Sequence, residues 1–177
     1  MRRIYESQAL DYDDEDPHKP KRKQTRRDEH QTRRAINWDS ASHALFPSRL
    51  RPLAIAVAVE TDRDVYPVDA PVNFRATFLN RIPFPVALKT ESPVRWRWSI
   101  DGVEEASHVT DHPKETTLFR FGRGERKTFH RQWTQRFRTS AHTWESAARG
   151  EHTLEVRMSV PGAEKKGLVA ETTFRIE

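Results

Sequence analysis

The chain has 177 residues, enough for one domain of ordinary size and a tail, and its 31 basic and 26 acidic side chains leave a formal charge of +5. The absence of cysteine excludes a disulfide framework, a zinc thiolate site and a cysteine nucleophile. No apolar run approaches the roughly 20 residues that a membrane-spanning helix needs, so we expect a soluble, cytoplasmic protein.

The first 34 residues carry charge in two blocks of opposite sign. Residues 6–16 contain six acidic side chains and no basic one, whereas residues 19–34 contain eight basic and two acidic ones. Residues 11–34 lack Ile, Leu, Val, Phe, Met and Trp, so burial cannot offset the entropy of ordering them. We predict a disordered acidic-then-basic linker there, and a short apolar docking peptide or a frayed terminus over residues 1–10.

Residues 35–52 are a second apolar island, which predicts a lead-in segment packed against the domain. From Leu53 onward, hydrophobic residues recur with the period of two that is typical of strands. Asp101-Gly102 favours a tight hairpin turn, and Ser140 favours the start of one or two helical turns over 140–148. The predicted strands cover residues 53–60, 72–78, 86–89, 94–101, 103–110, 125–133, 154–160 and 168–176.

About eight short strands, turn signals at intervals of about ten residues and the lack of a long helix indicate the fold class. We predict an all-β protein, an immunoglobulin-like antiparallel β-sandwich over residues 53–177, with a disordered charged N-terminal tail. Periodicity does not reveal the strand order.

The stretch PVRWRWSIDG, residues 93–102, has two interpretations. Tryptophans between arginines are typical of a stacking platform for single-stranded nucleic acid. In a strand, however, Val94 and Ile100 lie on the same side as Trp96 and Trp98, which makes that side apolar throughout. We therefore predict that the tryptophans fill the core and that the arginines face outward.

The order of several weak motifs within residues 53–160 resembles the BsuPI-type intracellular proteinase inhibitor family. The matching features are Asn80 followed by Pro85-Val86, the hairpin at Asp101-Gly102, a late Gly-x-x-Thr-Leu and the stretch GERKTFHRQW. This resemblance implies an immunoglobulin-like domain and inhibition of a proteinase. The chain differs where that family usually has Thr-Gly-Gln, since it reads Thr90-Glu91-Ser92. The whole chain also resembles small uncharacterised haloarchaeal proteins, which implies no activity.

The sequence contains no catalytic motif that we recognise, so we predict that the protein is not an enzyme and uses no cofactor. No P-loop, nucleophile elbow or dinucleotide-binding turn is present. His108, Asp111 and His112 have a spacing that can suit a metal, but two histidines in a predicted loop are a weak signal, and we predict no metal site.

The sequence is compatible with three functions. The first is a protein-binding module that uses a sheet face, an edge strand or the N-terminal peptide. The second is a nucleic-acid or ribonucleoprotein accessory protein that uses the basic tail and an arginine-rich sheet face, and the third is an intracellular proteinase inhibitor. The candidate basic face consists of Arg95, Arg97, Arg120, Arg123, Arg126, Lys127 and Arg131, unless these residues merely solvate a sheet. The candidate tail site consists of Ile4, Tyr5, Leu10, Lys21, Arg22, Lys23, Arg26, Arg27, Arg33 and Arg34.

Overall fold

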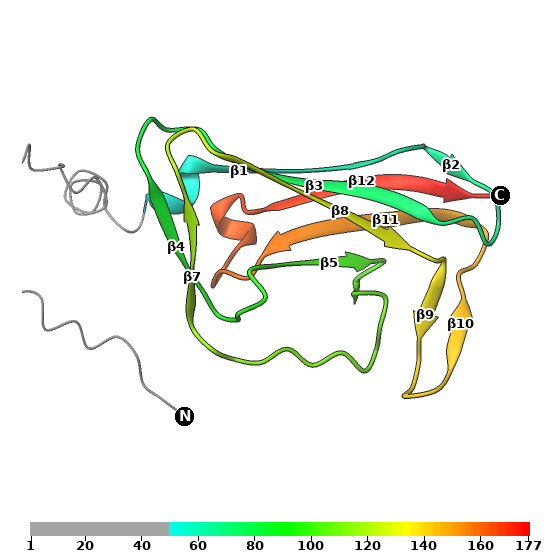
Figure 1. Cartoon of the computed structure of the whole chain (residues 1–177). Coiled ribbons are helices and arrows are strands. Elements are labelled where there is room, and N and C mark those ends of the chain that lie inside the picture. Colours follow the sequence, from blue (N-terminus) through cyan, green and yellow to red (C-terminus); the bar gives the residue numbers. More distant parts are fainter. Residues whose placement is uncertain (1–49) are drawn as a thin grey trace, which may run out of the picture. The chain divides into compact units, whose positions relative to one another are not determined.

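Two β-sheets face each other across a shared hydrophobic core in the computed structural model, which describes residues 50–177 (Figure 1). The first sheet is antiparallel, in the order β1 (Ile55–Thr61), β3 (Val72–Asn80) and β8 (Arg126–Trp133). The second sheet has five strands, in the order β2 (Val65–Tyr66), β12 (Val169–Ile176), β11 (Gly150–Met158), β5 (Trp96–Ile100) and β6 (Val103–Glu104). Within this sheet, the short pairing of β2 with β12 is parallel and the other pairings are antiparallel.

The alternation of buried and outward-facing residues along β3 explains how the two sheets pack together. Its buried residues Val72, Phe74, Ala76 and Phe78 point to the core, while the residues between them point outward. On β11, buried hydrophobic residues alternate with half-buried polar ones in the same way. Burial of these two apolar faces against each other is the main stabilising term of such a sandwich. The prediction of an all-β immunoglobulin-like sandwich is confirmed.

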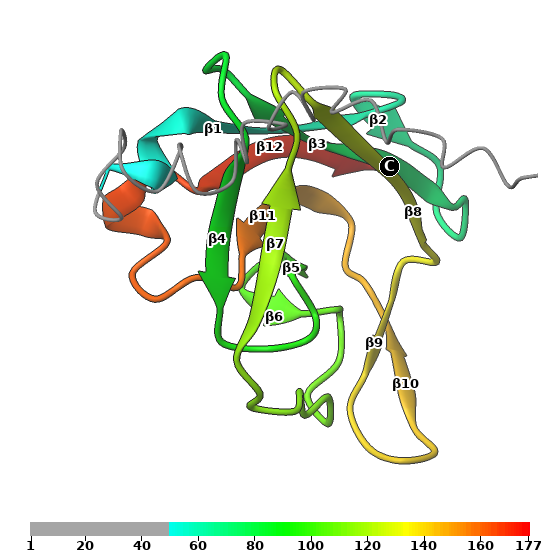
Figure 2. The same ribbon diagram turned by 60° about the vertical axis from the view of Figure 1, so that its left-hand side comes forward.

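A two-stranded ribbon, β4 (Val86–Thr90) paired with β7 (Thr117–Phe121), crosses one end of the two layers (Figure 2). It continues the pairing of β3 with β8 beyond an irregular bend. The buried Asn80 holds this bend, because its amide donates to the carbonyl oxygens of Phe84 and Gly122, both at 2.7 Å. The ribbon therefore closes the core with Phe119 and Phe121 from its inner face.

Two local predictions were wrong. A strand does not begin at Leu53, because residues Arg51–Ala54 form a 3₁₀ turn (η1) with a proline in its first turn, and Leu53 is exposed. Residues 140–148 are not helical: β9 (Arg136–Arg138) and β10 (Trp144–Ser146) form a hairpin there, and the hydroxyl of Ser140 bonds to that of Thr143 at 2.9 Å across its turn.

The hairpin turn at Asp101-Gly102 is confirmed by φ angles of 50° and 80° at these two residues. The strand that returns from it is shorter than expected, since β6 covers two residues only. A second 3₁₀ turn, η2 (Glu164–Lys166), lies between β11 and β12. The predicted segments 1–10 and 11–34, and residues 35–49 of the predicted lead-in segment, lie outside the described residues.

His152 ties the Asp101 turn to β11 from inside the sandwich. Its Nδ1 lies 2.6 Å from Oδ2 of Asp101, and its Nε2 lies 2.9 Å from the carbonyl oxygen of Ala148. The ring stacks on Phe174 at a centroid distance of 5.7 Å. A buried polar ring with both nitrogens paired is costly to remove, since both oxygens then lose a partner.

We expect His152→Ala to lower the free energy of unfolding by about 3 kcal/mol, the sum of a cavity and of the lost hydrogen bonds. Urea unfolding followed by tryptophan fluorescence measures this change. His130→Ala, which changes an exposed residue on the outer face of β8, is the matched control and should alter stability by less than about 0.5 kcal/mol. Equal effects of the two substitutions would contradict the structural role of His152.

Candidate functional site

The residues of the candidate basic face lie on different sides of the domain. Arg97 lies on the outer face of the second sheet, where its Nη1 is 2.9 Å from Oε1 of Glu104. Arg120 and Arg126 are exposed on the outer faces of β7 and β8, and Arg123 lies in the turn between these strands. The remaining three, Arg95, Lys127 and Arg131, gather around one group of aromatic rings.

An aromatic cleft with a volume of about 250 Å³ opens between β5 and β8. Its floor contains Trp96, Trp98 and Phe129, and the ring centroids of Trp96 and Phe129 are 5.3 Å apart. Trp96 is 9% exposed, whereas Trp98 and Phe129 are half-buried. The tryptophans thus belong to the core, as predicted, but the core reaches the surface here.

Arginine side chains lie over two of the aromatic rings that line this cleft. The guanidinium carbon of Arg131 lies 5.3 Å from the ring centroid of Trp96, and that of Arg95 lies 5.6 Å from the centroid of Phe119. Both arginines are exposed and line the cleft, and the half-buried Glu105 lines it as well. Cations held over π faces are attracted by the ring quadrupole and still present donors to a ligand.

Lys127 extends this arrangement beyond the cleft. Its ammonium lies 5.5 Å from the ring centroid of Phe121 and contacts a carboxylate oxygen of Glu125. That hydrogen bond, together with the backbone N–H of Gly122, holds the pKa of Glu125 below its ordinary value. Lys127 and Arg131 share the inward-facing side of β8 with Phe129 and Trp133, so their charged ends turn outward to the solvent.

The cleft is open because both sheets end there. β8 is the last strand of the first sheet, and among the described residues no strand pairs with its second edge. In the second sheet, β6 pairs with Ser99 and Ile100 of β5 and leaves the Trp96 end of that strand without a neighbour on this side. The sandwich is therefore closed at its centre and open along one side.

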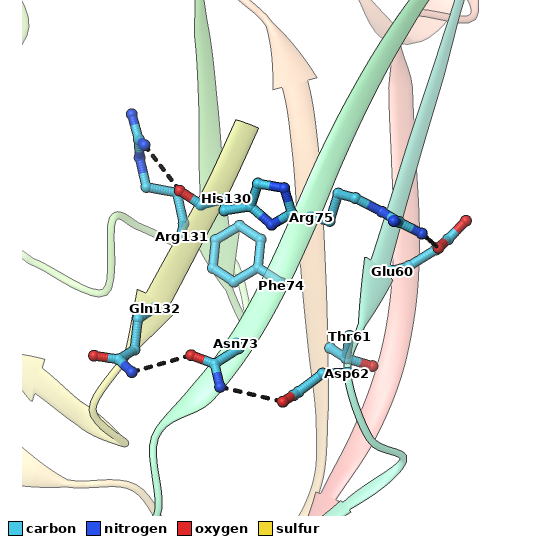
Figure 3. A pocket seen from close by; sticks show the side chains of 9 residues that line it. All are labelled: Glu60, Thr61, Asp62, Asn73, Phe74, Arg75, His130, Arg131 and Gln132. Carbon is cyan, nitrogen blue, oxygen red and sulfur yellow. Dashed lines mark hydrogen bonds and ion pairs between the residues drawn. The ribbon is translucent and has the colours of Figure 1, made fainter. Parts of the chain in front are cut away.

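A polar groove lies on the outer face of the first sheet, with a volume of about 610 Å³ (Figure 3). Asn73 is at its centre: it accepts a hydrogen bond from Gln132 at 3.0 Å and donates one to Asp62 at 3.1 Å. In the next row, Arg75 of β3 forms an ion pair with Glu60 of β1. Figure 3 shows that these side chains reach toward one another from β8, from β3 and from the end of β1 and the residue after it.

Tyr66 anchors one end of this polar row. Its hydroxyl donates to Oδ1 of Asp62 and accepts from the backbone N–H of Arg63 at 3.1 Å. The hydrogen bond from Tyr66, with a weaker contribution from Asn73, holds the pKa of Asp62 below its ordinary value of 3.8. Burial, and then the bond to Asp62, raise the pKa of Tyr66 to about 12.

The two surfaces differ in what they offer a ligand. Several polar side chains of the groove already bond to one another, so a ligand has to replace existing hydrogen bonds and ion pairs. Such cross-strand pairs are common on the solvent-exposed face of a sheet. The aromatic cleft combines uncovered ring surface with exposed guanidinium groups. Of the two, the cleft is the better candidate binding site.

The groove residues escaped prediction because their pairing depends on strand register. Glu60, Arg75 and His130 each stand at an outward position of a predicted strand, which is a usable signal. The sequence does not reveal, however, that β3 lies between β1 and β8 and brings these three into one row. The candidate tail residues lie outside the described part of the chain.

The weak metal motif does not assemble a ligand set. Nε2 of His112 lies 3.5 Å from Oε1 of Glu104 and 4.0 Å from Oε1 of Glu105, and His108 is exposed. Within residues 50–177 there is no group of three or more His, Asp or Glu side chains with the geometry of a metal site. In the same range, no helix has the length and apolar character to cross a membrane.

Comparison with known proteins identifies a family but no activity. A model of a family of unknown function (DUF7974) matches residues 43–177, and no curated protein sequence matches the chain. Among solved structures, the chain is similar to the CARDB domain of a Pyrococcus furiosus protein crystallised with di-metal ions, at 13% identity and a TM-score of 0.44, over 69% of this chain and 91% of that one.

Two larger proteins contain a similar portion. An alkylpurine DNA glycosylase of Pseudomonas fluorescens, bound to DNA with an abasic site analog, is 18% identical with a TM-score of 0.39, over 70% of this chain and 30% of that one. A β-glucosidase of Listeria innocua, in complex with isofagomine, is 11% identical with a TM-score of 0.42, over 69% of this chain and 16% of that one. At these values we transfer neither ligand nor activity from any of the three.

The pKa of Asp62 predicts a pH-dependent effect of Tyr66→Phe. Because the folded pKa of Asp62 is lowered, its ionised carboxylate contributes stability that is fully present above about pH 4 and is lost as the pH falls through the folded pKa. Removal of the Tyr66 hydroxyl should return the pKa of Asp62 toward 3.8 and destabilise the fold more at neutral than at acid pH. Carboxyl NMR titration and urea unfolding at several pH values measure both effects, with Gln132→Ala as the control at the far end of the row.

Proposed function

The chain belongs to a family of unknown function, DUF7974, and we propose that its sandwich is a non-catalytic protein-binding module whose site is the aromatic cleft beside β8. The observation that carries this proposal is the uncovered aromatic surface of Trp98 and Phe129 with Arg95 and Arg131 beside it. Tryptophan and arginine are among the residue types that contribute most to the free energy of binding between proteins.

The position of the cleft favours an extended partner segment. Among the described residues no strand pairs with the second edge of the eight-residue β8, and the cleft lies beside the inward side of this strand. One carbonyl oxygen of β8, that of His130, accepts a hydrogen bond from Nη1 of Arg131 at 3.0 Å, which a partner strand could replace. A peptide that adds to the edge forms main-chain hydrogen bonds and sends alternate side chains toward the sandwich. One large apolar side chain of the partner would then occupy the cleft.

The charges at the cleft favour an acidic partner. Arg95 and Arg131 outnumber the single carboxylate of Glu105 among the ionisable groups that line it. Inward-pointing charges on an edge strand also deter unwanted strand pairing, because an apolar strand that docks there must cover them. A segment with a carboxylate near its apolar residue is compatible with these cations, whereas the same cations on β8 of a second copy would oppose pairing of two β8 edges.

A second candidate function is binding of single-stranded nucleic acid. It rests on one observation, that Trp98 and Phe129 lie within reach of two arginines in the same cleft, which suits base stacking with phosphate contacts. The basic tail, residues 19–34, would supply most of the affinity in that case. Inhibition of a proteinase, the third function suggested by sequence resemblance, stays a prediction that an assay against intracellular serine proteinases tests.

Selection from a random peptide library on the full chain tests the protein-binding proposal. We expect the enriched peptides to combine a large apolar residue with an acidic one, and Arg131→Glu to weaken their binding by about tenfold or more through charge repulsion. Hydrogen exchange should show new protection along β8 when peptide is bound.

Arg126→Glu is the matched control, because it reverses the same charge on the same strand but on its outer face. It should leave peptide affinity within about twofold of the unchanged chain. An equal loss of peptide affinity in the two variants would contradict the proposal of a site in the cleft. Selected peptides that lack acidic residues would contradict it as well.

The nucleic-acid alternative predicts a steep salt dependence of binding to an unstructured oligonucleotide of thymidines or uridines. Deletion of residues 19–34 should remove most of the affinity and flatten the salt slope, since each lost phosphate contact lowers that slope by about one. Fluorescence anisotropy at several salt concentrations measures both quantities. Absence of binding at low salt excludes this function.

A further inference from the structure

A second groove lies at the end of the domain that the ribbon closes, on the opposite face of β7 from the aromatic cleft. It runs along the β4–β7 ribbon between η1 and the loop that carries η2, with a volume of about 390 Å³. Figure 2 shows η1, β4 and η2 together at this end. Phe119 of β7 points into the core and the aromatic cleft, whereas its neighbours Leu118 and Arg120 line this groove.

The charge of the groove has one sign. Among the described residues, four ionisable side chains line it, and all four are cations: Arg51, Lys89, Arg120 and Lys166. Arg51 and Arg120 also take part in other interactions, so the attraction of an anionic partner rests on Lys89 and Lys166. The ammonium of Lys166 bonds to the carbonyl oxygen of Pro161, which holds it at the rim. Like charges gathered along one groove raise the local potential and attract an anionic partner.

The floor of the groove is aliphatic. Leu118 is 44% exposed, and Pro52, Ala87, Val160 and Pro161 lie along the same groove. An exposed leucine among aliphatic side chains loses water contact when a partner covers it. None of the described residues that line this groove is aromatic, so none of them can stack on a nucleobase as side chains of nucleic-acid sites do.

We propose that this groove binds an acidic peptide segment of another polypeptide, with carboxylates toward Lys89 and Lys166 and aliphatic side chains over Leu118. Charge complementarity selects an acidic partner, and the aliphatic floor favours a peptide over a nucleic acid. The groove is separate from the cleft beside β8, so the domain would hold two partner segments, or two parts of one partner, on opposite faces of β7.

A fluorescein-labelled peptide of about ten residues, with glutamate at alternate positions and leucine or proline between them, is the probe. We expect it to bind the full chain in low salt, with an affinity that falls steeply as salt is added. Lys89→Glu should weaken binding by about tenfold, and Leu118→Gln by about fivefold at unchanged salt slope, because one removes charge attraction and the other removes apolar contact.

Lys114→Glu is the matched control, since Lys114 is an exposed lysine outside the groove and the substitution changes the net charge equally. It should leave affinity within about twofold. Equal weakening by Lys114→Glu and Lys89→Glu would overturn the proposal in favour of unspecific attraction. A uridine oligonucleotide that loses affinity on Lys89→Glu, while the peptide does not bind, would overturn it in favour of nucleic acid. Because Arg131→Glu leaves this groove intact, failure at the aromatic cleft and failure here are distinguishable.

Discussion

Packing around Phe78 holds the separate parts of this domain together. Its fully buried ring lies 5.6 Å from Trp96, 6.1 Å from Phe119 and 5.9 Å from Phe129, measured between ring centroids. These four residues come from β3, β5, β7 and β8, so one cluster joins the first sheet, the second sheet and the ribbon. Loss of one ring would leave a cavity that its neighbours fill poorly, because aromatic side chains bury large areas with specific geometry.

The same cluster creates the open surface of the domain. Each sheet ends beside it, and in the part of the chain that the structure describes no further strand covers the rings. Arg131 and Arg95 take that place by lying over Trp96 and Phe119. A cation over a ring covers apolar surface while it keeps its charge in water, which makes this side of the sandwich tolerant of solvent and receptive to an acidic, apolar partner.

Alternation explains why one strand serves two surfaces. On β7, Phe119 faces the core while Leu118 and Arg120 face the basic groove, since successive side chains of a strand point to opposite faces. On β8, His130 and Gln132 line the polar groove, whereas Arg131 lines the aromatic cleft and also reaches the polar groove. A protein of this size can therefore present several chemically distinct surfaces on a single core.

The sequence by itself determined the fold class, most strands, the turn at Asp101-Gly102 and the burial of Trp96, because side-chain periodicity and turn chemistry are local properties. The hairpin at residues 136–146 was not predicted, because a serine such as Ser140 is as common in a turn as at the start of a helix. Only the tertiary structure decided that Arg95 and Arg97 serve different faces, the first beside Phe119 and the second paired with Glu104. Which strand ends a sheet, and which residues stand opposite each other, depend on long-range pairing that no local pattern encodes.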